Sequence, residues 1–504
     1  MKKIIVALCL PIMILSAGCK KFLDEKPYSF LTSLNFPTSE EEADIALRGI
    51  YSIMQGNDDA DFRMFDYTLP VITSEACDNM TPYYIIPNLR KNESLYEGPY
   101  FSFFQGINFA NNLISVLEKG DGLTGAWVEV KLAEAKAIRA YYYFWLVRMF
   151  SDVPLKLDPT TTGNYKGERT PVPEIYKQIV EDLKFAEDKL PNRADPDGRI
   201  TKGGCKGILT QVYAAMAGSR RTPDGQNIAG DPANWALARD KAKEVLDLGV
   251  YTLAGDYAQI FKDLAMDIYN PEMIFDVSFS YDGGDDYGAT FPYIFGPAAV
   301  GGAASMGGGK GSGLGVFREW VRELDPDDLR IEWNIAKYQY QAKSWTKLYY
   351  TDTTQWRVAK WRKWPDNDDS HQFYWGNYLY NWPLVRLADI KLLYAEAINE
   401  TNNGPTAEAY QQVNDIRHRA GLADLPGGLT KEQFKDRIMN ERSIEFLGEG
   451  MRHFDLVRWG NFKQMMDKRL EAIWVTNYGG VDESYMNAPV PQQELDINGW
   501  SQNK

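Results

Sequence analysis

The hydrophobic and polar positions of this chain alternate mainly with the period of an α-helix. The clearest stretch is 126–150, where apolar residues recur in steps of three and four, at Val130, Ala133, Ala137, Ala140, Phe144 and Val147. This spacing places them on one face of a helix. Asp152 and Pro154 follow, and residues of these types end helices. We therefore predict a helix over 126–150.

Similar patterns, bounded by helix-start and helix-stop residues, predict further helices over 38–54, 173–190, 202–217, 232–248, 384–400, 405–420, 430–447 and 454–474. Most are about 16 to 20 residues long and follow one another as pairs, which is typical of helical-pair solenoids. The sequence shows no strict internal repeat. The predicted fold class is mainly α, a tetratricopeptide-like helical-pair scaffold with an irregular, loop-rich subdomain containing short strands.

Two long stretches lack helical periodicity. Residues 57–100 are rich in Asp, Asn, Pro and Tyr, and residues 251–382 are dense in Gly and Trp, with a strand candidate at Met273–Val277. Long irregular segments inside a compact protein are usually functional. We predict one domain over 38–504, in which ligand-binding loops at about 57–100 and 251–382 interrupt a helical scaffold at 38–56, 101–250 and 383–475.

The first residues carry a targeting signal. Two lysines precede the apolar run Ile4–Ala17, and small residues lead up to Cys19. Fourteen apolar residues are too few to span a membrane, and Pro11 interrupts them. We predict a lipoprotein signal peptide over 1–18, removed so that Cys19 becomes a lipidated N-terminus. Residues 19–37 would then be a tether that holds the protein at a membrane.

Charge and cysteine content narrow the function. The net charge is −14, and loss of two signal-peptide lysines makes it −16, which disfavours nucleic acid as a partner. Cys77 and Cys205 either form one disulfide in an oxidising envelope or are two small buried residues, and the helical pattern around Cys205 favours burial. Three histidines and no Cys/His cluster offer no metal centre. We predict no cofactor and leave a structural calcium ion open.

Catalytic motifs are absent from the sequence. Acidic runs at 282–286 and 366–369 supply carboxylate pairs of the kind that glycoside hydrolysis uses. Such runs in glycine-rich loops are more often solvated turns, and the chain has no GxSxG, HExxH or P-loop motif. We predict that the protein is not an enzyme, and a glycoside hydrolase remains the less favoured alternative.

Three glutamates stand four residues apart near a predicted helix end, at Glu441, Glu445 and Glu449. Like charges at this spacing repel, so they require nearby cations. The nearest in sequence are Arg442, Arg452 and Arg458. We predict a structural ion network here rather than a catalytic site.

The aromatic content is high, with 14 Trp, 30 Tyr and 23 Phe. Most of these rings are expected to be core. A few in the loops are expected to form a platform for sugar rings, because binding sites combine aromatic walls with a few placed polar groups. The predicted ligand-binding residues are Asp78, Asn79, Tyr83, Tyr84, Tyr281, Asp285, Tyr287 and Trp345.

One set of motifs, read in order, resembles a known family. The stretch Glu134–Phe144, followed by Leu146–Pro154, resembles the signature helix of SusD/RagB lipoproteins, nutrient-binding proteins of the Bacteroidetes outer membrane. Further matches follow in the family's order, at Thr170–Tyr176, Asn270–Phe275, Val385–Ala397, Val413–Leu422, Glu441–Gly460 and Pro489–Pro491. The ordered set covers nearly the whole chain.

The resemblance implies four tetratricopeptide-like helix pairs and a surface lipoprotein of the outer membrane. Such a protein captures an oligosaccharide and passes it to a partner, a SusC-like TonB-dependent transporter. The shared motifs belong to the scaffold and carry no ligand residues, so the resemblance does not assign the site. Some members bind peptides instead, and a peptide ligand is the alternative within the family.

Overall fold

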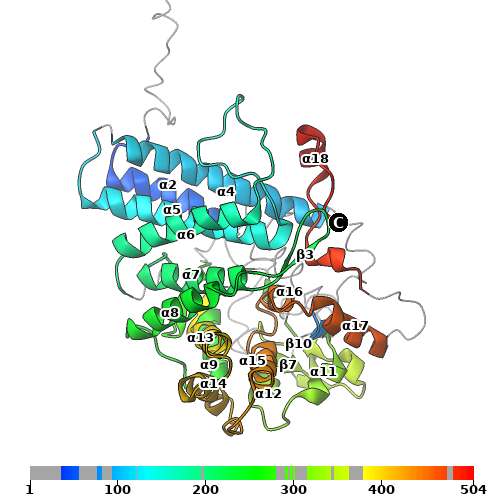
Figure 1. Cartoon of the computed structure of the whole chain (residues 1–504). Coiled ribbons are helices and arrows are strands. Elements are labelled where there is room, and N and C mark those ends of the chain that lie inside the picture. The colour runs from blue at the N-terminus through cyan, green and yellow to red at the C-terminus, as the bar shows by residue number, and fades with distance from the viewer. Residues whose placement is uncertain are drawn as a thin grey trace, which may run out of the picture.

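The fold is that of a computed structural model (Figure 1). The structure describes residues 36–55, 77–81, 94–120, 122–193, 198–279, 289, 291–292, 296–297, 299–300, 315–341, 346–362, 379–473 and 481–504. Within them no helix is both long and apolar enough to cross a membrane. The protein is mainly helical with short strands, as predicted.

Most of the helices stack one on the next along one side of the molecule (Figure 1). The stack consists of α2 (Glu40–Gln55), α4 (Ser94–Lys119), α5 (Ala126–Phe150), α6 (Val172–Lys189), α7 (Lys202–Ala217), α8 (Asn234–Asp247), α13 (Leu387–Thr401) and α14 (Ala407–Arg419). Each helix packs on the next in this order. Their sequential packing confirms the helical-pair scaffold.

Helix α5 packs against α2, α4, α6 and α7. The predicted apolar face is buried from Ala133 onward, Val130 is half-buried, and Tyr141, Tyr142 and Tyr143 are buried around the rest of the helix. A helix that is buried nearly all round belongs to the core. The guanidinium of Arg139 on α5 donates two hydrogen bonds to the carboxylate of Asp182 on α6, and both N–O distances are 2.9 Å. A polar contact of this geometry fixes how the two helices sit on each other.

The remaining helices flank the stack: α9 (Tyr257–Ala265), α11 (Arg318–Glu323), α12 (Arg330–Asn334), α15 (Lys431–Glu445), α16 (Arg452–Arg458), α17 (Phe462–Ile473) and α18 (Gln492–Asn498). The single helix predicted over 454–474 is wrong, because the chain breaks between α16 and α17. Gly460 lies at the break with a φ of 72°. A left-handed residue of this kind ends a helix.

Two other boundaries differ from the predictions. Helix α4 begins at Ser94, inside the stretch expected to be loop, and carries Pro99 within its first turns. The helix predicted over 384–400 begins instead as strand β11 (Trp382–Arg386), with α13 following directly. A short apolar run fits a buried strand and a buried helix equally well. Pairing with β4 (Met273–Val277), which was predicted as a strand, decides the outcome.

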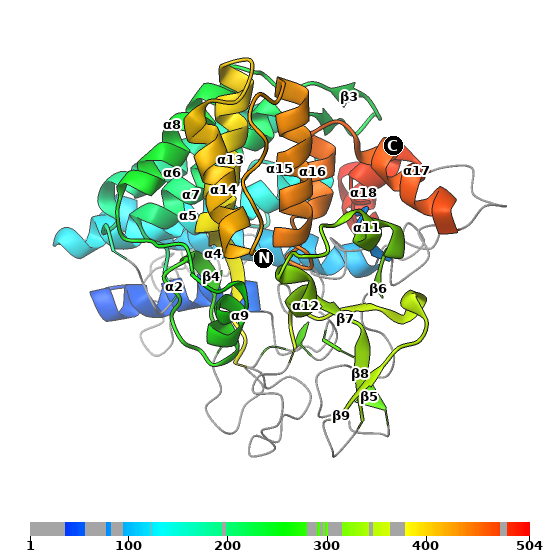
Figure 2. The same cartoon turned by 90° about the horizontal axis from the view of Figure 1, so that it is seen from below.

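Of the other described strands, β5 to β9 lie on one side of the helices, whereas β3 lies on the opposite side (Figure 2). An antiparallel sheet has the order β1 (Met80–Thr81), β6 (Gly315–Val316), β10 (Arg357–Val358) and β7 (Ile335–Ala336). A second sheet has the order β5 (Ala299–Val300), β8 (Tyr338–Gln341) and β9 (Thr346–Tyr349), with β5 parallel to β8. A hairpin pairs β2 (Arg220–Arg221) with β3 (Asn227–Ile228).

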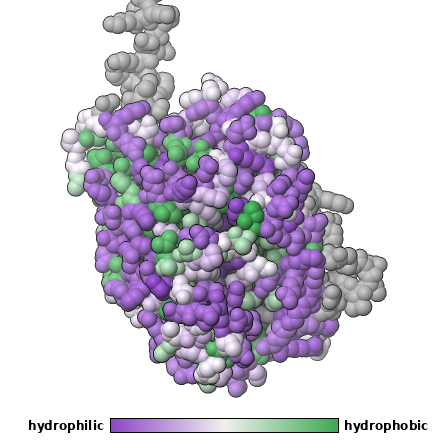
Figure 3. Space-filling view, in the orientation of Figure 1, coloured by the Kyte–Doolittle hydropathy of each residue, from purple (hydrophilic) through white to green (hydrophobic). Residues whose placement is uncertain are grey.

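The state of the cysteines and the character of the surface remain to be described. Cys77 and Cys205 are both buried and form no disulfide, so the structure favours the second of the two interpretations of the sequence. On the face shown in Figure 3, hydrophilic side chains cover most of the surface and apolar ones lie scattered between them. Scattered apolar side chains are normal for a surface in contact with water.

The close approach of α4 and α5 yields a prediction. A Cβ atom added at Gly106 would lie 2.4 Å from Cε2 of Tyr142. We expect Gly106→Ala to lower the free energy of unfolding by about 1 to 3 kcal/mol, the usual cost of overpacking a core. Urea denaturation followed by circular dichroism measures it.

The control is Gly49→Ala in α2, where an added Cβ meets nothing within 4 Å. There the loss of glycine's backbone freedom should raise the free energy of unfolding by about 0.5 to 1 kcal/mol. Equal effects of the two substitutions would contradict the close packing of α4 on α5.

Candidate functional site

Two of the predicted ligand residues are inside the protein. Asp78 and Asn79 are both 0% exposed. The Asp78 carboxylate accepts from Nε and Nη2 of Arg452 at 2.6 and 3.0 Å, and Nδ2 of Asn79 donates to the Ser443 carbonyl at 2.9 Å. In contrast to the prediction, they attach this segment to α15 and α16. Their partners are more than 360 residues away in sequence, so local composition gave no sign of them.

The other six lie outside the described residues, as does the predicted lipidation site, Cys19. They are Tyr83, Tyr84, Tyr281, Asp285, Tyr287 and Trp345. The described residues that flank them show where these segments start and end. Thr81, just before Tyr83, pairs with Gly315. Thr346, just after Trp345, pairs with Gln341 at the end of β8.

A third anchor lies at the end of the β4–β11 pair. The backbone N–H of Phe279, just before Tyr281, donates to Oδ1 of Asn381 at 2.9 Å. Strand β7 leads directly into β8, which joins the two small sheets along the chain. The described ends of the predicted loops are therefore fastened to these two sheets and to the β4–β11 pair, which together we call the strand-bearing frame. Trp361, after β10, stacks on Trp382 of β11. The strands β5 to β9 lie on the same side of the molecule in Figure 2.

An aromatic core supports this frame. Trp361 and Trp382 stack with ring centroids 4.9 Å apart, and Phe291 meets both edge to face. These rings are buried, as is Trp333, which confirms that many of the tryptophans are core. In contrast, Tyr349 on β9 is 71% exposed. It is an aromatic side chain open to solvent at the edge of the frame.

Beneath the frame lies a buried network of charged groups centred on Glu445, which is 0% exposed. Its Oε1 accepts from Arg386 at 3.0 Å and from Arg419 at 2.5 Å, and its Oε2 accepts from Arg330 at 3.0 Å. Further members surround this centre: Glu272, Asp328, Lys360, Glu441 and Glu449. The carboxylates and cations alternate, so no buried charge in this cluster stands without an opposite one.

The network was predicted, but its partners were not. Arg442 binds Asp389 and Asp455, and Arg458 binds Glu396 and Asp455. Arg452 binds Asp78, as described above. Neighbours in a helix point about a quarter-turn apart, so an arginine next to a glutamate faces another side. The cations that neutralise Glu445 come instead from β11, α12 and α14.

Electrostatics in the network follow from this geometry. Burial alone would raise the pKa of Glu445, but the charges of Arg419, Arg386 and Arg330 outweigh it and hold the pKa well below its usual range. Burial also lowers the pKa of Lys360 to about 8, against the opposing charge of Glu449. These groups are enclosed by protein and paired with one another, as is typical of a structural ion network.

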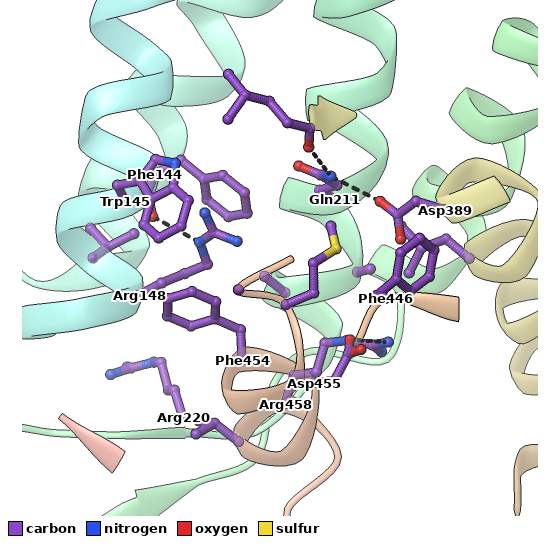
Figure 4. A pocket seen from close by; sticks show the side chains of 18 of the residues that line it. Phe144, Trp145, Arg148, Gln211, Arg220, Asp389, Phe446, Phe454, Asp455 and Arg458 are labelled. Carbon is purple, nitrogen blue, oxygen red and sulfur yellow. Dashed lines mark hydrogen bonds and ion pairs between the residues drawn. The ribbon is translucent and has the colours of Figure 1, made fainter. Parts of the chain in front are cut away.

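A pocket beside this network lies among α5, α6, α7, β11, α13, α15 and α16 (Figure 4). Arg386 and Glu449 of the network are part of its lining. Its cavity measures about 100 Å³. The guanidinium of Arg148 lies in it between aromatic rings, with its carbon 3.9 Å from the centre of Phe144, 4.5 Å from Trp145 and 4.4 Å from Phe454. Arg220 lies at the edge of the same pocket (Figure 4). The sequence analysis did not single out either arginine.

Two family models match the chain in succession. A model described as "Starch-binding associating with outer membrane" matches residues 21–214, and the SusD family model matches residues 271–500. The chain belongs to the SusD family. The resemblance stated from the sequence motifs is thereby confirmed.

Relatives and solved structures agree with this assignment. SusD-like protein P25 of Formosa agariphila is 24% identical over 95% of this chain and 94% of its own. A SusD homologue from Bacteroides thetaiotaomicron superposes with a TM-score of 0.81 at 26% identity, covering 94% of this chain and 98% of that one. Surface glycan-binding protein A from the same organism, solved with laminarihexaose, superposes with a TM-score of 0.71 at 21% identity, covering 92% and 99%.

The charge network of this SusD-family protein yields a prediction. We expect Glu445→Gln to lower the free energy of unfolding by about 3 to 5 kcal/mol, because buried arginines lose their carboxylate. Glu129→Gln is the control, since Glu129 pairs with Lys189 at the surface with its side chain 63% exposed. The control should change stability by at most about 1 kcal/mol.

The charge of Glu445 also predicts how the free energy of unfolding depends on pH. The folded pKa of Glu445 is lowered, so its charge stabilises the fold fully above the unfolded pKa of about 4.3, and this stabilisation falls as the pH drops further. Below that pH, the free energy of unfolding of Glu445→Gln should fall by about 1.4 kcal/mol less per pH unit than that of the wild type. Unfolding curves recorded across the pH range measure this difference. Parallel pH profiles would contradict the assigned charge state.

Proposed function

We propose that this protein is a cell-surface glycan-binding lipoprotein. It captures an oligosaccharide or polysaccharide and delivers it to a partner TonB-dependent transporter of the SusC type, while lipid on Cys19 holds it in the outer membrane. The main support is the likeness over nearly the whole chain to a surface glycan-binding protein solved with laminarihexaose. The description of the matching family model, starch-binding and associating with outer membrane, supports the same compartment and ligand class.

The arrangement of the described residues supports a site on the strand-bearing side. The segments that carry Tyr83, Tyr84, Tyr281, Asp285, Tyr287 and Trp345 leave the frame at Thr81, Phe279 and Gln341. A rigid frame under variable loops is the usual way to position binding groups. Tyr349, four residues after Trp345, adds an exposed ring. The rings would stack on the C–H faces of sugars, and the carboxylate would accept bonds from their hydroxyls.

No chemical step belongs to this proposal. Hydrolysis of a glycosidic bond needs a pair of carboxylates placed on either side of it, whereas the buried carboxylates of the Glu445 network are all paired with cations. We therefore propose capture without cleavage. A peptide remains the alternative ligand, and the negative charge of the chain would favour basic peptides.

The proposal predicts a selective binding profile. Residues 20–504 should bind one class of glycan in calorimetry, when tested against plant, host and microbial polysaccharides, and should release no reducing ends from it. A mixed peptide pool serves as the control ligand. Binding to peptides alone would move the assignment to the peptide alternative, and release of reducing ends would show a hydrolase.

The site residues can be tested with the same glycan. Tyr83→Ala and Tyr287→Ala should each weaken binding about tenfold, since each removes one stacking ring. Their melting temperatures should stay near the wild-type value. Tyr165→Ala is the matched control, because Tyr165 is 52% exposed and lies between α5 and α6 on the helical scaffold. Unchanged affinity in both loop variants would contradict this placement of the site.

A further inference from the structure

Another cavity lies on the helical scaffold, among α4, the α5–α6 connection (residues 151–171) and α18. These three elements lie close together near the top of the molecule in Figure 1. The cavity measures about 290 Å³, and none of its described lining residues comes from a strand or from a segment with a predicted ligand residue. It is therefore a different place from the loop site that the strand-bearing frame supports.

Hydrogen bonds fasten the α5–α6 connection at both sides of the cavity. The Thr160 N–H donates to Oδ1 of Asn108 on α4 at 2.8 Å. Further along, the Gly167 N–H donates to Oδ1 of Asn498 on α18 at 3.1 Å. The three elements that line the cavity are thus joined to one another, as in a binding site that is formed before its ligand arrives.

Aromatic rings make up much of the lining. Tyr100, Phe101 and Phe104 come from α4, and Tyr165 comes from the α5–α6 connection. Tyr100 is buried and packs against Phe104, with ring centroids 4.9 Å apart. Phe101 and Phe104 are only half-buried, and Tyr165 is 52% exposed. The last three rings are therefore partly open to a ligand.

Polar groups with unused hydrogen-bonding capacity stand among these rings. Nδ2 of Asn108 has no partner in the described part of the chain, since only its Oδ1 and its carbonyl are used. The half-buried carboxyl group of Glu494 accepts from the side chain of Asn498 at 3.0 Å. Burial raises the pKa of Glu494, because the protein keeps water away from the carboxylate. One donor and one acceptor thus remain for a ligand.

The charges of the lining balance each other. Among its described residues, Lys156 is the only cation and Glu494 the only acid. The Lys156 ammonium donates to the backbone carbonyls of residues 164, 165 and 166 at 2.7, 2.8 and 3.1 Å, which uses its three donors. The cavity therefore has no donor of a free cation for an anion. It suits a neutral ligand that has apolar faces for the rings and hydroxyl groups for the amide and the carboxyl group.

We propose that this cavity binds one neutral hexose ring and is a second saccharide site of the protein. The C–H faces of the sugar lie against Phe101, Phe104 and Tyr165. Its hydroxyl groups bond to Asn108 and Glu494. The volume lies just below the ~300 to 1,000 Å³ of small-molecule sites, which suits a single ring rather than a chain. The ligand class rests on the proposed function, whereas the place of the site does not.

A single sugar ring binds such a site weakly. Small ligands gain a limited binding free energy per atom, so the expected Kd is about 1 mM. The loop site is titrated with glycans at concentrations well below this value, so Tyr165→Ala remains a control for it. The scaffold site needs high concentrations of a monosaccharide and a measurement that shows where the sugar binds.

Hydrogen exchange measured by mass spectrometry meets both needs. Residues 20–504 are exchanged with up to about 20 mM methyl glucoside, methyl galactoside or methyl mannoside, well above the expected Kd. Erythritol, an acyclic polyol, is the reference. At least one glycoside should protect the amides of the α5–α6 connection and of α18, and erythritol should not. Absence of this protection with all three glycosides would overturn the proposal.

Two variants assign the protection to particular side chains. Tyr165→Ala removes an exposed ring, and Glu494→Gln removes the carboxylate. Each should raise the glycoside concentration that gives half-maximal protection about tenfold. Arg239→Gln is the control, because it removes a charge from the surface of α8, where Arg239 pairs with Asp240, and should leave that concentration unchanged. The same concentration in all three variants would overturn the site.

The loop site and this site can fail separately. Tyr83→Ala should leave the protection of the α5–α6 connection unchanged, because Tyr83 belongs to a different segment. Protection of the connection in a protein whose loop variants bind glycans as the wild type does would remove the loop site and keep this one. Loop-dependent glycan binding without protection of the connection would overturn this inference alone.

Discussion

The structure depends on the burial of Glu445 among three arginines. A charge enclosed in protein is costly unless opposite charges and hydrogen-bond donors surround it. Here the donors come from Arg330, Arg386 and Arg419, which are 115, 59 and 26 residues away in sequence. None of these segments can leave without exposing an unpaired charge to an apolar interior. All charges of the network are therefore paired only when the segments that carry these residues meet in this one arrangement.

This arrangement connects the two halves of the molecule. Glu272 stands just before β4, Arg386 ends β11 and Arg330 begins α12, which leads into β7. Lys360, which follows β10, donates to the Glu445 carbonyl at 2.8 Å. The residues at the ends of these strands are thus bound to α15. Through α13 and α14 they are also bound to the helical stack. The segments with the predicted ligand residues leave from this frame, so the network supports the proposed binding side from within the protein.

Sequence patterns predicted most of the scaffold helices, although they missed the break at Gly460 and strand β11. Periodicity placed α5 at its actual bounds, and the motif order found the family, because both depend on residues close in sequence. Contacts between distant residues could not be read in this way. The burial of Asp78 depends on Arg452, and the partners of Glu445 come from three other elements. A polar residue in a loop looks the same in sequence whether it faces water or a buried arginine.

Hydrogen exchange measured by mass spectrometry on Arg386→Gln, with Arg239→Gln as the matched control, tests the central role of the network most directly. Removing Arg386 takes away the shared partner of Glu272, Glu445 and Glu449. Our account predicts that β4, β7, β11 and α15 lose protection together, while α4, α5 and α6 keep theirs. Loss of protection confined to β11, or the same small change in protection in both variants, would contradict the claim that this network holds the strand-bearing frame to the scaffold.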